Sequence, residues 1–173
     1  MSKELNLSKE YHVVANIPYN ITSPIIFKIL EEEKIASATL MVQKEVCDRI
    51  TAKKGIKAYN ALSVIIQYYM DVEKIMNVSK KLFHLIPKVD SAVFRMRRKK
   101  VLFDKDKTSL FIKIVKSAFH QKRKTLINNL NHSMEIEKSD LGLYLDSINI
   151  DKNLRAEMIS VNDFMKIVEN WPF

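Results

Sequence analysis

The stretch Val13-Val14-Ala15-Asn16-Ile17-Pro18-Tyr19-Asn20 decides the fold that we expect for this chain. Residues 11–15 are apolar and rich in β-branched side chains, which predicts a buried strand of a parallel sheet. Directly after the motif, Thr22-Ser23-Pro24 is typical of a helix start, with a hydroxyl cap and a proline in the first turn. The order of strand, turn and helix indicates an α/β protein. Its ligand site is expected at the carboxyl ends of the strands.

The four residues Asn16-Ile17-Pro18-Tyr19 suit the activation of an aromatic amine such as N6 of adenine. The lone pair of that nitrogen is delocalised into the ring, so the amine is a poor nucleophile. Two fixed acceptors, the Asn16 side-chain oxygen and the Ile17 carbonyl, would bind the amino hydrogens and free the lone pair. Pro18 would hold Ile17 extended, and Tyr19 would stack on a flipped-out base. Catalysis would then rest on positioning and hydrogen bonding, without a metal.

An ordinary strand-to-helix turn is the structural alternative for the same motif. Asn and Pro are common turn residues for reasons unrelated to catalysis. The four residues taken alone leave both interpretations open, and the rest of the chain has to discriminate between them.

The composition is that of a chain able to bury a hydrophobic core. Of its 173 residues, 47% are hydrophobic, which suits one domain or one domain with a small appendage. No apolar run approaches the length of a membrane span, and no signal-peptide pattern opens the sequence. The single cysteine, Cys47, excludes an internal disulfide, and the histidines show no metal-ligand spacing with it. We therefore expect a soluble, cytoplasmic protein with no metal site and no membrane partner.

Positive charge is unevenly distributed along the chain, which carries a formal net charge of +9. Residues 1–100 contain 18 Lys and Arg against 10 Asp and Glu, whereas residues 101–173 contain 11 against 10. A first cluster follows a predicted strand and comprises Arg95, Arg97, Arg98, Lys99 and Lys100. A second cluster lies in a span without acidic residues and comprises Lys113, Lys116, Lys122, Arg123 and Lys124. Such clusters suit a phosphate backbone, although solvated surface charge explains either one equally well.

The remaining pattern alternates strands and helices and then becomes helical. Residues 1–10 are polar and predicted as a lead-in. Further strands are predicted over residues 36–42, 72–78 and 92–96, the last two as an antiparallel pair. Helices are predicted over residues 44–53, 60–69, 108–119, 123–130 and 160–171, with shorter helical pieces at 141–145 and 154–159. Ser160 is expected to cap the last helix, with Asp163 in its first turn. We expect a partial catalytic domain over residues 1–100 and a helical domain over residues 101–173.

Five stretches, taken in order, resemble the motifs of one enzyme family. Besides the first motif, they are Gln43-Lys44-Glu45-Val46-Cys47-Asp48-Arg49, Lys57-Ala58-Tyr59-Asn60-Ala61-Leu62-Ser63-Val64, Pro87-Lys88-Val89-Asp90-Ser91-Ala92-Val93 and Ala118-Phe119-His120-Gln121-Lys122-Arg123-Lys124-Thr125-Leu126. They resemble the small-subunit (16S) rRNA adenine N6-dimethyltransferases, the kasugamycin-sensitivity methylases, over about residues 11–171. The macrolide-resistance methylases share the first motif, but residues 121–126 fit the small-subunit enzymes better. The same stretch and the helical tail argue against a DNA adenine methylase.

The resemblance implies the carboxyl-terminal half of a Rossmann-like methyltransferase sheet, followed by a small all-helical domain that helps to hold ribosomal RNA. The implied reaction moves methyl groups from S-adenosylmethionine to N6 of two adjacent adenosines near the 3′ end of small-subunit rRNA. The catalytic residues would be Asn16, Ile17, Pro18 and Tyr19. Asn16 would also lie beside the cofactor, and Tyr19 and Phe83 would sandwich the base. Candidate RNA contacts are Arg97, Arg98, Lys122, Arg123 and Lys124.

The connection that carries Phe83 departs from the family's pattern. Leu85 and Ile86 replace two prolines of the family's pattern in the same connection, so we expect a less stiff loop. A core or lid phenylalanine is the alternative interpretation.

The largest departure from the family is the lack of a glycine-rich loop, because Gly55 and Gly142 are the only glycines. The family's glycine motif, its ribose-binding acid and the Asp that contacts the cofactor's adenine belong before residue 11. We therefore expect a chain with an incomplete cofactor site that is inactive alone. The alternative is a non-catalytic rRNA-binding or ribosome-assembly module. The strand at residues 11–15 would expose its backbone edge and both faces, including Val13 and Val14, which predicts self-association.

Overall fold

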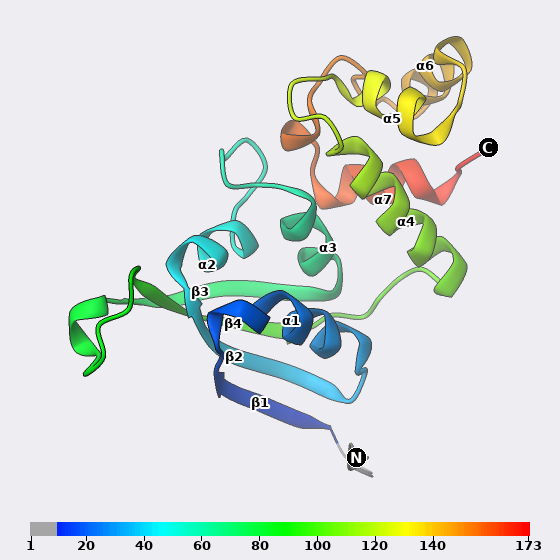
Figure 1. Cartoon of the computed structure of the whole chain (residues 1–173). Coiled ribbons are helices and arrows are strands. Elements are labelled where there is room, and N and C mark those ends of the chain that lie inside the picture. Colours follow the sequence, from blue (N-terminus) through cyan, green and yellow to red (C-terminus); the bar gives the residue numbers. More distant parts are fainter. Residues whose placement is uncertain (1–9) are drawn as a thin grey trace. The chain divides into compact units, whose positions relative to one another are not determined.

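The computed structural model describes residues 10–173, which form two compact units (Figure 1). The first unit contains residues 10–51 and 69–100, and the second contains residues 52–68 and 101–173. Apart from Glu10, the predicted polar lead-in lies outside the described residues.

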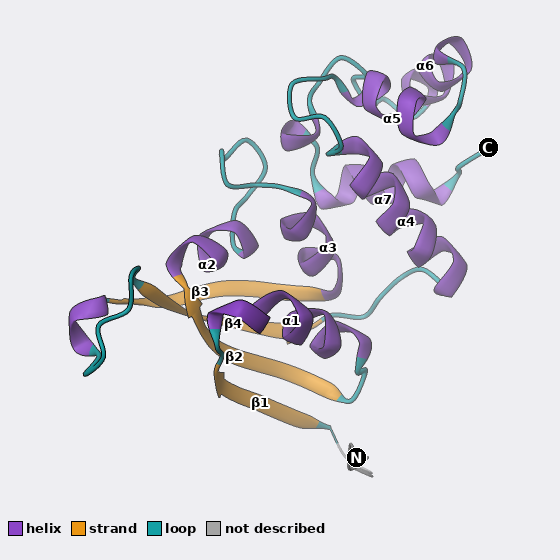
Figure 2. Ribbon diagram, viewed as in Figure 1, coloured by secondary structure: helices purple, strands orange, loops and turns teal. Residues whose placement is uncertain are grey.

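A mixed four-stranded sheet forms the centre of the first unit (Figure 2). Its strands are β1 (Tyr11–Asn16), β2 (Ile35–Gln43), β3 (Met70–Val78) and β4 (Ser91–Arg98). They lie in the order β1-β2-β4-β3, so the last strand of the chain is inserted between β2 and β3. β1 and β2 are parallel, whereas β4 is antiparallel to both of its neighbours. The predicted antiparallel pair is confirmed.

This topology brings four segments together at one end of the sheet. Asn16 of β1 pairs with Met41 near the end of β2. Ser91, the first residue of β4, pairs with Gln43 on one side and with Val78 on the other. β1, β2 and β3 therefore finish where β4 begins, and we call this the carboxyl end of the sheet.

One face of the sheet carries the core of the first unit. Ala38, Leu40 and Val42 of β2 are fully buried, because every second residue of a strand points to the same side. Phe94 and Met96 of β4 are equally buried opposite them. Helices α1 (Thr22–Glu31) and α2 (Lys44–Ile50) pack against these strands. Within this unit the sheet forms one layer and the two helices form the second.

The prediction of a buried first strand is wrong, whereas the expected exposed edge of the same strand is found within the described sheet. Val14 is 82% exposed, whereas Val13 is partly covered and pairs with the buried Ala38. β1 has β2 as its only partner among residues 10–173, so it is an edge strand of the described sheet. A β-branched composition predicts a strand equally well at the edge or in the centre of a sheet. The number of neighbouring elements decides how deeply the side chains of that strand are buried.

Helix boundaries differ from the sequence pattern where local hydrogen bonds decide them. The Thr22 hydroxyl does not cap α1. It donates back to the Pro18 and Tyr19 carbonyls, at 3.4 and 3.3 Å. The second predicted helix ends early, at Ile50. Ser160 caps α7 (Val161–Glu169) in a reciprocal capping box with Asp163, as predicted.

The second unit is a cluster of helices with its own core. Its longest members are α3 (Ala61–Tyr69, up to Tyr68), α4 (Lys105–Ala118), α5 (Leu126–Met134), α6 (Lys138–Ser147) and α7. α4 packs against α5 and α7, and α5 packs against α6. The fully buried side chains include Phe111, Ile114, Leu130 and Phe164. The Tyr68 ring stacks on Phe111 with its centroid 4.3 Å away.

Residues 52–68 belong to this helical unit, although the sequence prediction had grouped them with residues 1–100. The buried Tyr59 hydroxyl donates to the Ile159 carbonyl at 3.0 Å, 100 residues away in the chain. The Gly55 amide donates to the Glu157 carbonyl at 2.8 Å. These long-range bonds have no local sequence signature, so a composition shift at residue 100 could not reveal them.

Candidate functional site

Two unused acceptors lie next to each other at the carboxyl end of β1. Asn16 is the last residue of the strand and is exposed, whereas the Ile17 side chain is buried. The Ile17 amide donates to the Met41 carbonyl at 3.2 Å, which ties this residue to β2. Among residues 10–173, no donor contacts the Asn16 side chain or the Ile17 carbonyl. The backbone is thus fixed while both acceptors stay available, the arrangement that hydrogen bonding to an amine requires.

Tyr19 is held by a hydrogen bond between its hydroxyl and that of another residue. The Tyr19 hydroxyl lies 2.6 Å from the hydroxyl of the fully buried Ser91, the first residue of β4. Pro18 before it has φ −56° and ψ 132°, and the Pro18 carbonyl accepts from the Ile21 amide at 3.1 Å. Tyr19 therefore begins a short 3-10 turn (Tyr19–Ile21) with both its backbone and its ring tip anchored. A half-exposed aromatic ring fixed at two points is a suitable stacking surface.

Phe83 lies in the connection between β3 and β4, directly after a 3-10 turn (Lys80–Leu82). The Asp90 carboxylate closes this connection, because it accepts from the Lys80 amide at 2.9 Å. Asp90 precedes Ser91 in the chain, so the residue that closes this connection and the residue that contacts the Tyr19 hydroxyl are consecutive. The loop itself is apolar and open, with Leu85 at 86% exposure and Ile86 at 67%.

The predicted RNA-binding residue Arg98 is used inside the fold. Its guanidinium donates to four backbone carbonyls, those of Ile29, Leu30, Glu32 and Ile35, at 2.6–3.2 Å. These carbonyls include the unsatisfied ones at the end of α1. Burial lowers the pKa of Arg98. Four of its five N–H groups are thereby occupied.

The first basic cluster lies at the opposite end of the sheet from Asn16 and Tyr19. Arg97 pairs with Ser37 at the start of β2. Arg95 forms an ion pair with Glu73, and the exposed Arg97 lies 3.8 Å from the same carboxylate. The fold therefore does not bring the motif Asn16–Tyr19 and this basic cluster together. The motif begins at the carboxyl end of β1, whereas the cluster lies at the carboxyl end of the antiparallel strand β4, which is the other end of the sheet.

Lys122, Arg123 and Lys124 are exposed on the loop between α4 and α5 in the second unit. Asn129, which is 2% exposed, fixes the base of this loop. Its side chain donates to the Ala118 and Gln121 carbonyls at 2.7 and 3.1 Å and accepts from the Gln121 amide at 3.1 Å. A buried amide thus positions three cations that have no acidic partner among the described residues.

The structure adds two residues to which the sequence reasoning gave no function. Asp90 and Ser91 stood within the fourth motif, but nothing in the sequence linked them to the first one. Only the pairing of β4 with β2 brings Ser91 to the end of the sheet where Tyr19 lies. The one sequence signal for these two residues is that they form a polar pair immediately before an apolar strand.

Within residues 10–173, no group of three or more His, Cys, Asp or Glu could hold a metal ion. In that same part of the chain, no helix is long and apolar enough to cross a membrane.

Asn16 is the one described residue that the resemblance would place beside the cofactor. Asn16 lies at the carboxyl end of β1, beside the strand's unpaired side. The sequence contains no glycine-rich turn that would hold the rest of such a cofactor. The residues present would therefore hold only part of such a cofactor.

Comparison with known proteins identifies related sequences over almost the whole chain. The family model for ribosomal RNA adenine dimethylase matches residues 1–171. A ribosomal RNA small subunit methyltransferase A from Phytoplasma australiense is 41% identical over 169 residues, which is 96% of this chain and 60% of the relative. The protein of the same name from Bacillus mycoides (strain KBAB4) is 40% identical over 168 residues, 94% of this chain and 58% of the relative. The chain thus spans about three fifths of the length of these relatives.

Solved structures give the same fold. A dimethyladenosine transferase from Plasmodium falciparum superposes with a TM-score of 0.81 at 26% identity, covering 95% of this chain and 67% of that one. The 23S rRNA methyltransferase ErmE superposes with a TM-score of 0.73 at 22% identity, covering 96% and 67%. The latter similarity concerns the fold alone. The predicted α/β class with a methyltransferase-like sheet is confirmed.

The Tyr19–Ser91 hydrogen bond should make a measurable and coupled contribution to stability. Tyr19→Phe and Ser91→Ala should each lower the free energy of unfolding by about 1 kcal/mol. Each substitution removes one hydroxyl of the hydrogen bond and leaves the other hydroxyl without its partner. The double variant should lose little more than the worse single variant, which gives a coupling of about 0.5–1.5 kcal/mol. Urea unfolding of the four proteins measures this cycle.

Tyr11→Phe is the matched control for this cycle. It removes a tyrosine hydroxyl from the same sheet but not from the carboxyl end. Strictly additive losses for Tyr19→Phe and Ser91→Ala, or an equal loss for Tyr11→Phe, would contradict the anchoring of Tyr19 by Ser91.

Proposed function

The chain belongs to the ribosomal RNA adenine dimethylase family, and on that premise we propose that it carries the catalytic and base-holding part of an enzyme that dimethylates adenosine in small-subunit rRNA. The substrate would be N6 of two adjacent adenosines near the 3′ end of that RNA. The observation that carries the proposal is the pair of unused acceptors at Asn16 and Ile17, beside the anchored ring of Tyr19.

Asn16 and Ile17 would prepare the amine for methylation. The Asn16 side-chain oxygen and the Ile17 carbonyl accept one amino hydrogen each, which draws the nitrogen towards a tetrahedral geometry and localises its lone pair. The bond from the Ile17 amide to Met41 holds the second acceptor in place, and Pro18 prevents the backbone from relaxing. The rate gain would come from prearranged groups rather than from a covalent intermediate.

Tyr19 and Phe83 would hold the adenine that has been flipped out of the RNA. Stacking on an aromatic ring is worth about 1–3 kcal/mol per base and tolerates any orientation within the ring plane. The Tyr19 ring is pinned through Ser91, and the loop of Phe83 is closed by Asp90. Tyr19 would act as the fixed wall, and Phe83 on its apolar loop as the movable one.

S-adenosylmethionine would supply the methyl group. Within this chain Asn16 is the residue proposed to contact it, and the rest of the cofactor site would come from residues that the family carries outside the part compared here. We therefore expect this chain alone to be inactive. We also propose a cytoplasmic location.

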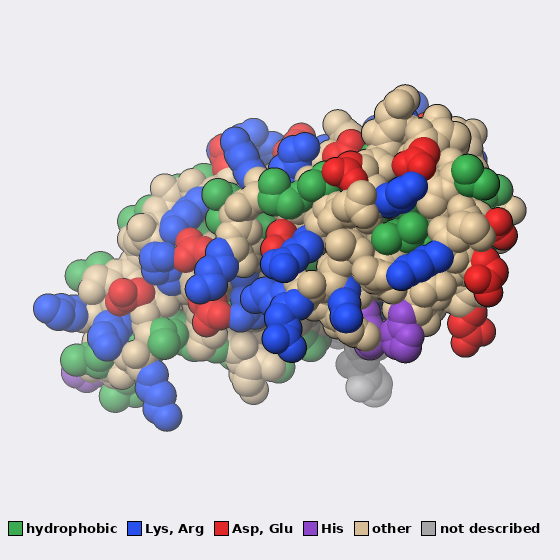
Figure 3. Space-filling view, turned by 90° about the horizontal axis from the view of Figure 1, so that it is seen from above, with side chains coloured by type: hydrophobic (Ala, Val, Ile, Leu, Met, Phe, Trp, Pro, Cys, Tyr) green, Lys and Arg blue, Asp and Glu red, His purple; other side chains and the backbone are tan. Residues whose placement is uncertain are grey.

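Lys122, Arg123 and Lys124 would contact RNA phosphates, as the resemblance suggests for the helical domain. Lys and Arg side chains are numerous on the face seen in Figure 3, with acidic side chains among them. Because acidic and basic side chains are mixed on this face, we expect RNA phosphates to bind at individual basic clusters and not along one continuous basic surface. Arg97 remains a weaker candidate because Glu73 lies close to it, and Arg98 is engaged with backbone carbonyls.

A non-catalytic rRNA-binding or ribosome-assembly module is the second candidate. The lack of a glycine-rich loop in the sequence favours it for this chain as it stands. The two functions differ in what Asn16 does, since a binding module has no need of an unused amine acceptor.

Replacing Asn16 by Ala should impair methyl transfer far more than RNA binding. Loss of one prearranged electrostatic contact typically costs about 10²–10³ in rate. Single-turnover methylation of small-subunit rRNA is measured with the chain and the amino-terminal half of a family member added as a separate protein. RNA affinity is measured in parallel, and Asn20→Ala on the neighbouring turn is the control. A native rate for Asn16→Ala would remove the catalytic assignment of Asn16, whereas no methyl transfer by the native chain in this assay would favour the binding module.

RNA binding by this chain should weaken steeply with salt, because each phosphate contact releases counterions. The double variant Lys122→Gln/Arg123→Gln should reduce the slope of log affinity against log salt by roughly 0.7 per lost contact with single-stranded RNA. Lys105→Gln/Lys138→Gln removes the same charge elsewhere in the second unit and should change the slope less. Equal slopes for both double variants would mean that the loop cations are only solvated surface.

The unpaired side of β1 should recruit another strand, in a second copy or in a partner. Val14 adds an exposed apolar side chain to this strand, and open strand edges are templates for pairing. Sedimentation of the chain should therefore show association that increases with concentration. Val14→Lys should reduce it, because charged side chains protect edges, whereas Val89→Lys on the exposed β3–β4 loop should not. A concentration-independent monomer would disprove this association.

A further inference from the structure

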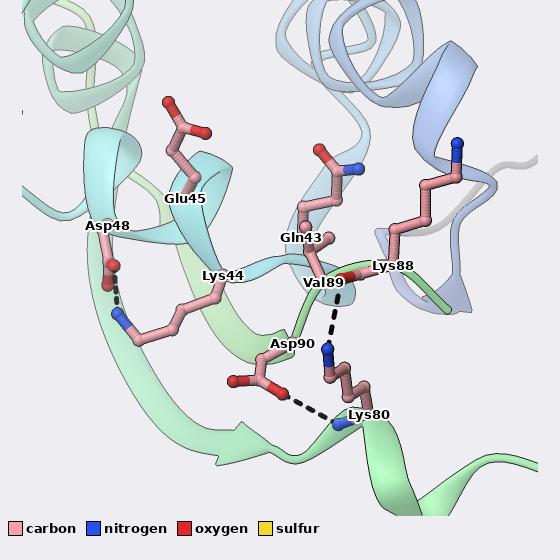
Figure 4. Close-up of a pocket in the computed structure, with 8 residues that line it drawn as sticks. All are labelled: Gln43, Lys44, Glu45, Asp48, Lys80, Lys88, Val89 and Asp90. Carbon is pink, nitrogen blue, oxygen red and sulfur yellow. Dashed lines mark hydrogen bonds and ion pairs between the residues drawn. The ribbon is translucent and has the colours of Figure 1, made fainter. Parts of the chain in front are cut away.

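A pocket of about 410 Å³ lies at the carboxyl end of the sheet, next to the anchor of Tyr19 (Figure 4). Its walls come from the end of β2, the start of α2 and the connection between β3 and β4. The lining residues are Gln43, Lys44, Glu45, Asp48, Lys80, Lys88, Val89 and Asp90. Gln43 pairs with Ser91, and Asp90 precedes it, so the pocket adjoins the residue that holds the Tyr19 hydroxyl.

The walls of this pocket are built from fixed groups. The Lys44 amide donates to the Asp90 carbonyl at 2.9 Å, which joins α2 to the start of β4. The Lys80 ammonium reaches the Lys88 carbonyl at 3.4 Å, and the Lys80 amide donates to Asp90. The connection between β3 and β4 is therefore folded back on itself at the mouth of the pocket (Figure 4).

The acidic groups of the pocket already have cationic or amide partners. Asp48 contacts the ammonium groups of Lys44 and Lys74 at 2.5 and 2.8 Å. Although burial opposes it, these hydrogen bonds lower the pKa of Asp48 and keep it ionised. Glu45 pairs with Arg49, and Asp90 accepts from the Lys80 amide. An acidic ligand entering here would not meet an unpaired carboxylate on these three side chains.

Two polar groups of the pocket remain available. Among the described residues, the Lys88 ammonium and the Gln43 amide have no hydrogen-bond or ion-pair partner. In Figure 4 the two side chains extend in the same direction, while Lys44 reaches across to Asp48. One point charge beside one amide is a combination that can take a phosphate and the edge of a base.

We propose that this pocket binds the nucleotide adjacent to the target adenosine, with Lys88 on the connecting phosphate and Gln43 on the neighbouring base. The proposal rests on the proposed function, because it places the target base at Tyr19. The reaction acts on two adjacent adenosines, so whichever one is being methylated has the other directly beside it. The pocket adjoins Ser91, the residue that contacts the Tyr19 hydroxyl, and therefore offers a place for that neighbour beside the target base.

Single-stranded RNA is the ligand that this geometry favours. Splayed bases of single strands are read on their edges by polar side chains, whereas the bases of a duplex are paired and less accessible to such groups. A peptide ligand would be served by apolar walls, and Val89 is the only apolar side chain in the lining. The position on the β4 side of β2 also separates this pocket from the unpaired side of β1, where a cofactor contact of Asn16 would lie.

The test compares adenosine with the dinucleoside monophosphate ApA and with ApA that carries a neutral methylphosphonate linkage. Binding to the native chain is followed by NMR chemical shifts, which also report that each variant is folded. ApA should bind about tenfold more tightly than adenosine, as expected for one charge-assisted contact. The methylphosphonate should lose most of this advantage without any change to the protein.

Lys88→Gln should weaken ApA binding by about tenfold and should leave adenosine binding unchanged. Gln43→Ala should weaken ApA binding about threefold, which corresponds to one neutral hydrogen bond. Lys34→Gln is the matched control, because it removes the same charge from an exposed lysine at the opposite end of β2. On the methylphosphonate, Lys88→Gln should have no further effect.

The proposal is overturned if ApA binds no more tightly than adenosine, if Lys88→Gln matches Lys34→Gln, or if adenosine binding falls in step with ApA binding. A failure of the proposed function has a different signature. Tyr19→Ala should weaken both probes equally, and an unchanged adenosine affinity in that variant would remove Tyr19 as the base-stacking residue whatever Lys88→Gln does.

Discussion

The antiparallel insertion of β4 between β2 and β3 is the constraint on which the candidate site depends. Because β4 runs against its neighbours, its first residue lies where the other strands end. That geometry brings the Ser91 hydroxyl to Tyr19 and brings Asp90 to the start of α2. A parallel fourth strand would place its last residues there instead, and the two anchors would be lost together.

Basic residues at the two ends of the sheet have different surroundings. Arg98, at the amino ends of β1 and β2, donates to carbonyls at the end of α1 and so closes the first unit. Lys88, at the carboxyl end, keeps its ammonium available. The burial of a guanidinium is tolerated when its donors are matched, and Arg suits this better than Lys because its fork is planar. Charge counts along the chain therefore overstate the surface available to RNA.

The groups of the candidate site all lie at one end of the sheet. They are the acceptors at Asn16 and Ile17, the ring of Tyr19 with its anchor at Ser91, and the pocket that Lys88 lines. A strand of RNA presents a base and a phosphate at each step. Under the proposed function, an amine site, a stacking ring and a cation would match that repeat, and membership of an rRNA dimethylase family agrees with it.

The sequence by itself determined the elements and the chemistry of the first motif. These include the alternation of buried and exposed residues along β2 and β4, the Ser160 cap, and the acceptors at Asn16 and Ile17. Each of them depends on residues that are close together in the chain, so local sequence rules can predict it. Tertiary structure alone decided which residues meet. The exposure of Val14 follows from the number of neighbouring strands, the capture of Arg98 from the fold of α1 onto the sheet, and the Tyr19–Ser91 bond from a pairing across 72 residues. Contacts of this kind depend on topology, and a single sequence does not encode topology in any local pattern.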